Sequence, residues 1–270
     1  MELTRGRGSI AAPRNGHSLL SRVALVAGIA IAAGLYVVCL QVAQVDFGKL
    51  WAGLPRLANW AARAWPPDVS ELSTLAYRAA ETVAMGTVGT TFGALLAVPV
   101  CLLAARNITP SPWLNVPARA VLNVLRGIDS FVFALFFVAA VGLGPFAGVL
   151  GVALHAAGTI AKLWSEAIET AEAGPIEAVS VTGAAKLKVV RYALIPDVLP
   201  SLSSTLLYMW EWSIRASTIL GVVGAGGIGQ ELKNSIDLLA FDKALTILLL
   251  ILAMVSVIDG ISAAIRRRLV

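Results

Sequence analysis

The sequence predicts an all-α integral membrane protein with six transmembrane helices, and three observations support this fold class. Of the 270 residues, 58% are hydrophobic and 14% are charged, and the mean hydropathy is +0.81; soluble domains are about 25% charged. The apolar residues form runs of about 20, the length that crosses a hydrocarbon core about 30 Å thick. Lysine and arginine lie mainly between these runs, as in membrane proteins, so the net charge of +5 does not indicate nucleic-acid binding.

The chain begins with a basic tail, residues 1–22, which precedes a first apolar run at residues 23–45. A secretory signal peptide has the same order of segments. However, this apolar run is long, and no convincing cleavage site with small residues follows it. We therefore expect an uncleaved first transmembrane helix with a cytoplasmic tail before it.

Residues 46–80 have a mixed composition and are predicted to lie at the periplasmic membrane surface. Leu50 and Leu54 recur at helical spacing beside Trp51 and Trp60. Indole rings prefer the membrane interface, and a helix with one apolar face lies in its plane. The segment therefore predicts a short interfacial helix.

Five further runs are predicted to cross the membrane within residues 81–267, namely 81–105, 118–141, 146–168, 199–223 and 245–265. Prolines or glycines interrupt the chain between several of them. With six spans, the basic tail lies on the same side as Lys186, Lys188, Arg191 and the arginines at 266–268. The positive-inside rule makes this side the cytoplasm, so both termini are expected there.

The polar segment between the predicted fourth and fifth spans, residues 170–196, has the most informative pattern. Pro175 suits the first position of a helix, and Glu177 suits its first turn, near the positive end of the helix dipole. After a bend at Gly183, a second short helix would lead into the next span. A compact knob and an ordinary amphipathic loop both fit this pattern.

Five residues of this segment resemble the EAA loop of ABC-importer permeases: Glu177, Ala178, Gly183, Ile195 and Pro196. That loop reads Glu-Ala-Ala, three residues, Gly, nine residues and Ile-x-Leu-Pro. Here Val179 replaces the second alanine and Ala193 replaces the isoleucine. In that family the loop is a coupling helix that docks on a cytoplasmic ATPase subunit. The resemblance implies that these five residues make this contact.

A second resemblance covers residues 81–267 and is to the permeases of phosphonate transporters. It rests on motifs at residues 142–148, 154–155, 162–169 and 207–229. The chain also departs from that family. Where the family has Arg-x-Ile-Pro-Glu/Asp, this chain has Arg126-Gly127-Ile128-Asp129-Ser130, and the usual Asn before the fifth-span arginine is replaced around Trp212-Ser213. These departures leave the detailed substrate preference open.

The resemblance implies a type I ABC-importer permease in the bacterial cytoplasmic (inner) membrane. It implies two ATPase subunits that hold ATP and Mg, an extracytoplasmic phosphonate-binding protein, surrounding membrane lipid, and a second permease copy, identical or paralogous. The chain lacks a Gly-x4-Gly-Lys-Ser/Thr loop and metal-ligand spacing, so we expect that it binds no cofactor and is not itself an enzyme. Phosphite, a phosphate-like oxyanion or methionine are alternative cargoes. A self-sufficient secondary transporter or channel is a further alternative, although such proteins commonly show internal repeats, which this chain does not.

A glycine-rich turn follows the predicted fifth span and contains Gly224, Gly226, Gly227 and Gly229. It fits the spacing Gly-x-Gly-x-x-Gly of dinucleotide-binding proteins, but that fingerprint requires a preceding strand in a soluble βαβ unit. We instead predict a gating turn whose glycines let backbones approach closely at a dimer axis. A simple tight turn is the alternative.

Charged residues inside predicted spans are candidates for the translocation pathway, because their burial in lipid is costly. Glu211 and Arg215 lie four residues apart on one helix face, and they either pair with each other or line an anion path. Arg126 and Asp129, one turn apart in the predicted third span, allow the same two interpretations.

Two other polar residues in the spans have simpler predicted roles. His155 is predicted to be a hydrogen-bonded packing residue, with a proton relay as the alternative. Asp259 is predicted to be solvated or paired with Arg266.

Overall fold

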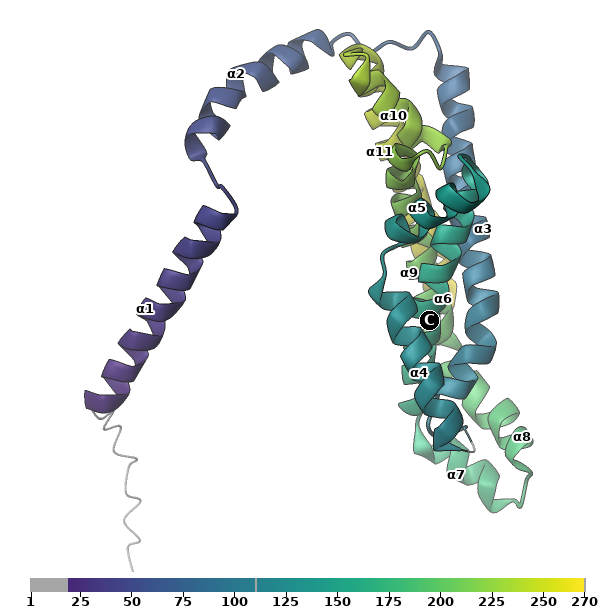
Figure 1. Cartoon of the computed structure of the whole chain (residues 1–270). Helices are drawn as coiled ribbons and strands as arrows, with labels where there is room; N and C mark the ends of the chain where they lie inside the picture. Colours follow the sequence, from purple (N-terminus) through teal and green to yellow (C-terminus); the bar gives the residue numbers. More distant parts are fainter. Residues whose placement is uncertain (1–18, 110, 270) are drawn as a thin grey trace, which may run out of the picture. The chain divides into compact units, whose positions relative to one another are not determined.

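A computed structural model describes residues 19–109 and 111–269, and its regular elements over these residues are all helical (Figure 1). This confirms the predicted all-α class. The predicted basic tail lies outside the described residues except for its last four positions. The chain divides into two compact units, one ending at Asn59 and the other beginning at Trp60.

The first unit contains α1 (Leu19–Val42) and most of α2 (Phe47–Arg63). α1 is long and apolar enough to cross a membrane. Asp46 begins α2, because its carboxylate accepts the backbone N–H groups of Gly48 and Lys49 at 2.8 and 3.1 Å and so satisfies donors that the first turn leaves free.

The second unit contains the remaining helices: α3 (Leu72–Ala104), α4 (Pro112–Gly127), α5 (Ser130–Val141), α6 (Pro145–Glu169), α7 (Ala173–Val181), α8 (Lys186–Val189), a π-helical turn (Val190–Leu194), α9 (Ile195–Leu220), a 3-10 turn (Gly221–Val223), α10 (Gly227–Asp237) and α11 (Phe241–Leu269). Helix α6 forms the centre of this unit and packs against α3, α4, α5 and α9. Small residues permit this packing. A side chain at Gly89 of α3 would collide with Val152 of α6, and one at Gly93 would collide with Ala156. The two backbones therefore lie close together, as is common between membrane helices with small residues at their contact.

Length and composition identify α1, α3, α6 and α11 as helices that could cross a membrane, and the pair α4–α5 as a possible bent fifth span. α9 has 26 residues but carries Asp197, Glu211 and Arg215, which lower its hydropathy. The predicted count of six is compatible with this arrangement if α9 also crosses.

The predicted third span, residues 118–141, contains a sharp break that we did not predict. α4 and α5 meet at an angle of 88°, and the chain between them is extended at Ile128 and Asp129. Asp129 starts a new helix there, because its carboxylate accepts the N–H of Phe131 at 2.8 Å. Hydropathy did not reveal this break, since apolar residues are frequent on both sides of it.

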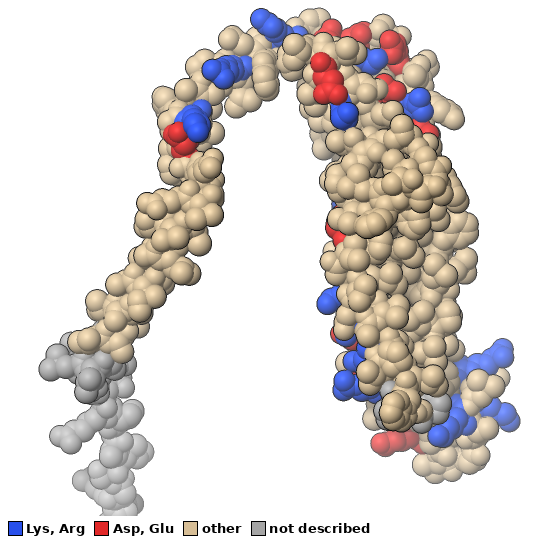
Figure 2. All heavy atoms as spheres, viewed as in Figure 1, with Lys and Arg blue, Asp and Glu red and all other residues tan. Residues whose placement is uncertain are grey.

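The two ends of the second unit differ in their elements. α7 and α8 lie at one end and α10 at the other (Figure 1). Lysine and arginine side chains gather at the α7–α8 end (Figure 2), where Lys186, Lys188 and Arg191 are exposed.

Candidate functional site

The segment between α6 and α9 forms two short helices joined by a turn, as its sequence predicted. Gly183 lies in that turn with φ of +75°, a backbone conformation that favours glycine. Where the segment joins α6 and α9, the N–H of Glu172, just before α7, donates to the carboxylate of Asp197 at the start of α9, at 3.1 Å. We predicted Pro175 at the first position of the first short helix. α7 begins at Ala173, so Pro175 occupies its third position instead.

The five predicted coupling residues do not all line one hollow. Ala178 and Pro196 line a shared hollow of about 430 Å³ between α7 and the start of α9. Glu177, Gly183 and Ile195 are exposed but do not line it.

Large apolar side chains are also exposed on this segment. Val181 is 87% exposed and Leu187 is 80% exposed. Exposed apolar residues at a polar end of the molecule are typical of a protein-binding surface.

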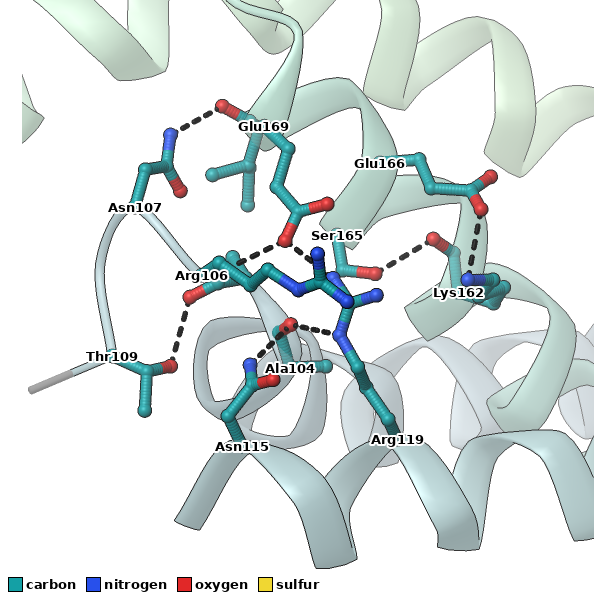
Figure 3. Close-up of polar contacts among 12 residues, drawn as sticks. Ala104, Arg106, Asn107, Thr109, Asn115, Arg119, Lys162, Ser165, Glu166 and Glu169 are labelled. Carbon is teal, nitrogen blue, oxygen red and sulfur yellow. Dashed lines mark hydrogen bonds and ion pairs between the residues drawn. The ribbon is translucent and has the colours of Figure 1, made fainter. Parts of the chain in front are cut away.

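A polar cluster beside this segment was not predicted from the sequence (Figure 3). The Glu169 carboxylate accepts the backbone N–H of Arg106 at 2.7 Å and a guanidinium N–H of Arg119. Arg119 Nε also donates to the carbonyl of Ala104 at 3.0 Å, and Asn107 donates to the carbonyl of Ile168 at 2.7 Å. These bonds hold the end of α6 against the α3–α4 corner, immediately before the segment that carries α7.

Replacing Arg119 by Ala is expected to lower the free energy of unfolding by about 1–3 kcal/mol, because the partly buried Glu169 would lose a charged partner. Lys162 provides a matched control. Its ion pair with Glu166, at 2.9 Å, lies within α6 and joins no second helix, so Lys162→Ala should cost about 0.3–0.5 kcal/mol. Thermal unfolding of the purified protein in detergent measures both. Equal shifts would contradict the role of Arg119 in joining helices.

The glycine-rich turn packs inside the second unit. Gly224, Gly226 and Gly227 all have positive φ. The N–H of Gly227 donates to Glu81 at 3.3 Å, and the next N–H donates to Thr82 at 2.9 Å, so the start of α10 is held on α3. These glycines therefore serve close contacts within one chain, and the predicted close approach at a dimer axis stays a prediction. Their role as a gate stays a prediction.

Four charged residues form a chain of ion pairs between α9 and α11. Glu211 pairs with Arg266 and, at 3.6 Å, with Arg215; Arg215 pairs with Asp259 at 3.0 Å. Of the two predicted alternatives for Asp259, the pairing with Arg266 was therefore wrong, whereas its side chain is 46% exposed, as the solvated alternative requires. The reason is that α9 and α11 run antiparallel, so the earlier residue on α9 meets the later residue on α11.

A pocket of about 300 Å³ lies beside this ion-pair chain. Its lining residues come from the start of α5 and from α9: Asp129, Ser130, Phe131, Trp212, Arg215, Ala216, Ile219 and Leu220. The pocket thus brings together two of the four predicted pathway charges, Asp129 and Arg215. Arg126 and Glu211 do not line it. Arg126 and Asp129 lie on opposite sides of the helix break, so they are not one turn apart in a single helix, as we had predicted.

His155 supports the helix break and the pocket wall. Its Nδ1 lies 2.9 Å from the carbonyl oxygen of Ile128, and its ring stacks on Trp212 with centroids 4.6 Å apart. This geometry fits the predicted packing role. Across the described residues, no group of three or more His, Cys, Asp or Glu side chains is placed to hold a metal ion.

His155→Leu is expected to lower the free energy of unfolding by about 1–3 kcal/mol, because the carbonyl of Ile128 would lose its donor. Asn places an amide donor near the position of Nδ1, so His155→Asn should recover most of this loss, whereas His155→Gln should not. Thermal unfolding measures stability, and near-ultraviolet circular dichroism follows the Trp212 environment. If Asn and Gln behave alike, the hydrogen bond does not matter.

Comparison with known proteins gives consistent similarities. Residues 89–270 match the family described as binding-protein-dependent transport system inner membrane component. HtxC of Stutzerimonas stutzeri, a candidate phosphite transport system permease protein, is 50% identical over 236 residues, which cover 87% of this chain and 84% of HtxC. PtxC of the same organism, a phosphite transport system permease protein, is 38% identical over 92% of this chain and 88% of PtxC.

Two further similarities extend this set. The phosphate-import permease protein PhnE of Mycolicibacterium smegmatis is 43% identical over 76% of this chain, but this match covers 39% of PhnE. One chain of the MetNI methionine ABC transporter, solved in an inward-facing conformation, is 26% identical with a TM-score of 0.66, over 75% of this chain and 99% of that chain.

Proposed function

The chain belongs to the binding-protein-dependent transport system inner membrane components, and from this we propose that it forms the pathway of an ATP-driven importer for phosphonates or a closely related oxyanion such as phosphite. The observation that carries this proposal is the projecting α7–α8 segment, with its EAA-like spacing and its exposed apolar residues. In an ABC importer the permease does not hydrolyse ATP, so it must contact a separate ATPase at such a surface.

The orientation follows from charge. The basic α7–α8 end faces the cytoplasm under the positive-inside rule, and both termini lie on that side. Two ATPase subunits, which hold ATP and Mg, then dock from the cytoplasm on two permease copies. An extracytoplasmic binding protein delivers the substrate at the α10 end.

Transport then proceeds by alternating access. ATP binding draws the ATPase subunits together, the two α7–α8 segments follow, and the pathway between the permease copies opens outward. Hydrolysis and separation of the ATPase subunits return the pathway to an inward-facing state. Such rigid-body motions of packed helices are an established form of conformational switching.

The proposed cargo is an oxyanion of phosphorus, because two observations favour it over methionine. The relatives that share 50% and 38% identity are named for phosphite transport, while D-methionine permeases share 26–28%. The pocket also presents Arg215, and a guanidinium offers oxyanions a planar set of donors that does not lose its charge.

The proposal is tested by ATPase stimulation in liposomes that contain this chain and its candidate ATPase. The candidate binding protein is added in turn with phosphonate, phosphite, phosphate or methionine. We expect stimulation by the phosphonate-loaded or phosphite-loaded form. Stimulation by methionine alone would refute the cargo class, and failure of the ATPase to bind the chain would refute the coupling role.

A further inference from the structure

We propose that Asp259 acts as an internal substitute for the transported anion, occupying Arg215 when the pocket is empty and releasing it when an anion enters. This inference rests on the proposed function and deepens it. In this proposal Asp259, which lies outside the pocket lining, lowers the affinity of the pathway for its cargo.

Arg215 lines the pocket and is also part of the ion-pair chain between α9 and α11. Its Nη1 donates to both carboxylate oxygens of Asp259, at 3.0 and 3.2 Å. Asp259 lies on α11 and does not line the pocket. A carboxylate and a phosphorus oxyanion present similar pairs of acceptor oxygens to a guanidinium, so both compete for the same donors.

The local charges explain why this competition matters. Glu211 is 8% exposed and is paired with Arg266, while Arg215 is paired with Asp259. The four charges sum to zero, and Asp129 adds a negative charge to the pocket lining. An oxyanion that leaves water for this pocket meets no net positive charge, which makes entry unfavourable. Entry becomes less unfavourable once Arg215 exchanges Asp259 for the oxyanion, because the guanidinium then faces the oxyanion directly.

This exchange keeps the affinity of the pocket for the anion low, and a transport pathway needs low affinity so that its cargo can leave. Binding of the anion must break the Arg215–Asp259 pair, so part of its binding free energy is spent on that step. When the anion leaves, Asp259 re-forms the pair and opposes rebinding. Removal of the Asp259 charge should therefore strengthen anion binding and slow release.

The test measures direct binding of radiolabelled phosphite to the purified permease–ATPase complex without binding protein. We expect Asp259→Asn to bind phosphite about tenfold more tightly than the wild type, a change of about 1.4 kcal/mol, and to show a lower maximal transport rate. Asp259→Glu retains the charge and should behave like the wild type. The double variant Asp259→Asn with Arg215→Gln should lose the gain.

Unchanged or undetectable phosphite binding by Asp259→Asn would overturn the inference, as would a gain that persists without Arg215. Size-exclusion chromatography checks folding, and Asp259→Ser serves as a second neutral variant if Asn does not fold. The outcomes also separate the two proposals. If wild-type ATPase responds to a loaded binding protein but Asp259→Asn gains no affinity, only the role of Asp259 fails; if wild type does not respond at all, the proposed function fails.

Discussion

Gly229→Ala is expected to destabilise the protein by about 3 kcal/mol or more, the upper range for forcing extra atoms into a packed interior. An added Cβ would collide with the backbone carbonyl of Thr218. Backbone atoms cannot rotate away as a flexible side chain can, so α10 would have to move off the end of α9. That movement would also disturb the bonds that hold the start of α10 on Glu81 and Thr82.

Gly260 provides the matched control for this substitution. It also lies within a helix, but among the residues that the structure describes no atom lies within 4 Å of the position that its Cβ would take. Gly260→Ala should therefore keep or raise stability, because alanine is favoured over glycine in helices by up to about 1 kcal/mol. The yield of folded protein in detergent and its unfolding temperature report both effects. Gly229→Ala unfolding at the temperature of Gly260→Ala would show that the close contact is not required.

Gly183→Pro is expected to reduce the ATPase stimulation by loaded binding protein at least about fivefold, the lower range for coupling between distant sites. Two features of the turn forbid proline. Its ring fixes φ near −65°, whereas Gly183 has φ of +75°. Proline also lacks the N–H that Gly183 donates to the carbonyl of Ser180 at 3.0 Å. The turn would change its course, and α7 would leave its orientation relative to α8.

Gly183→Asn separates the conformation of this turn from the loss of glycine itself. Asparagine tolerates positive φ better than other residues with a side chain, and it keeps the N–H. No atom of residues 19–109 or 111–269 lies within 4 Å of the position of a Cβ at this site, so the side chain fits. We expect Gly183→Asn to retain most of the stimulation, and both variants to insert into membranes. Normal substrate uptake by Gly183→Pro would show that the coupling assignment is wrong.

Several features of this protein could be read from the sequence because they depend on local composition or spacing. Apolar runs identified the membrane class, since the free energy of moving a segment into lipid depends mainly on its own residues. The spacing from Glu177 through Gly183 to Pro196 located the projecting segment between α6 and α9. Its glycine was predicted at a bend and lies in one, because a positive φ has a strong local preference.

Other features were decided by tertiary packing. The break between α4 and α5 depends on capping by Asp129 and on His155, which is 27 residues from its partner Ile128. Hydropathy cannot register such contacts. Glu169 likewise meets Arg106 and Arg119, which are 63 and 50 residues away in the chain.

The ion pairs between α9 and α11 combine a feature that the sequence predicted with one that depends on packing. The sequence identified Glu211 and Arg215 as intramembrane charges, because a charged residue in an apolar run is evident at once. It did not identify Asp259 as the partner of Arg215. Partners are chosen by the antiparallel register of two helices that are distant in sequence, and that register follows from packing of the whole unit. Local composition therefore shows which residues are costly to bury, whereas the packing of distant helices sets which partner compensates each of them.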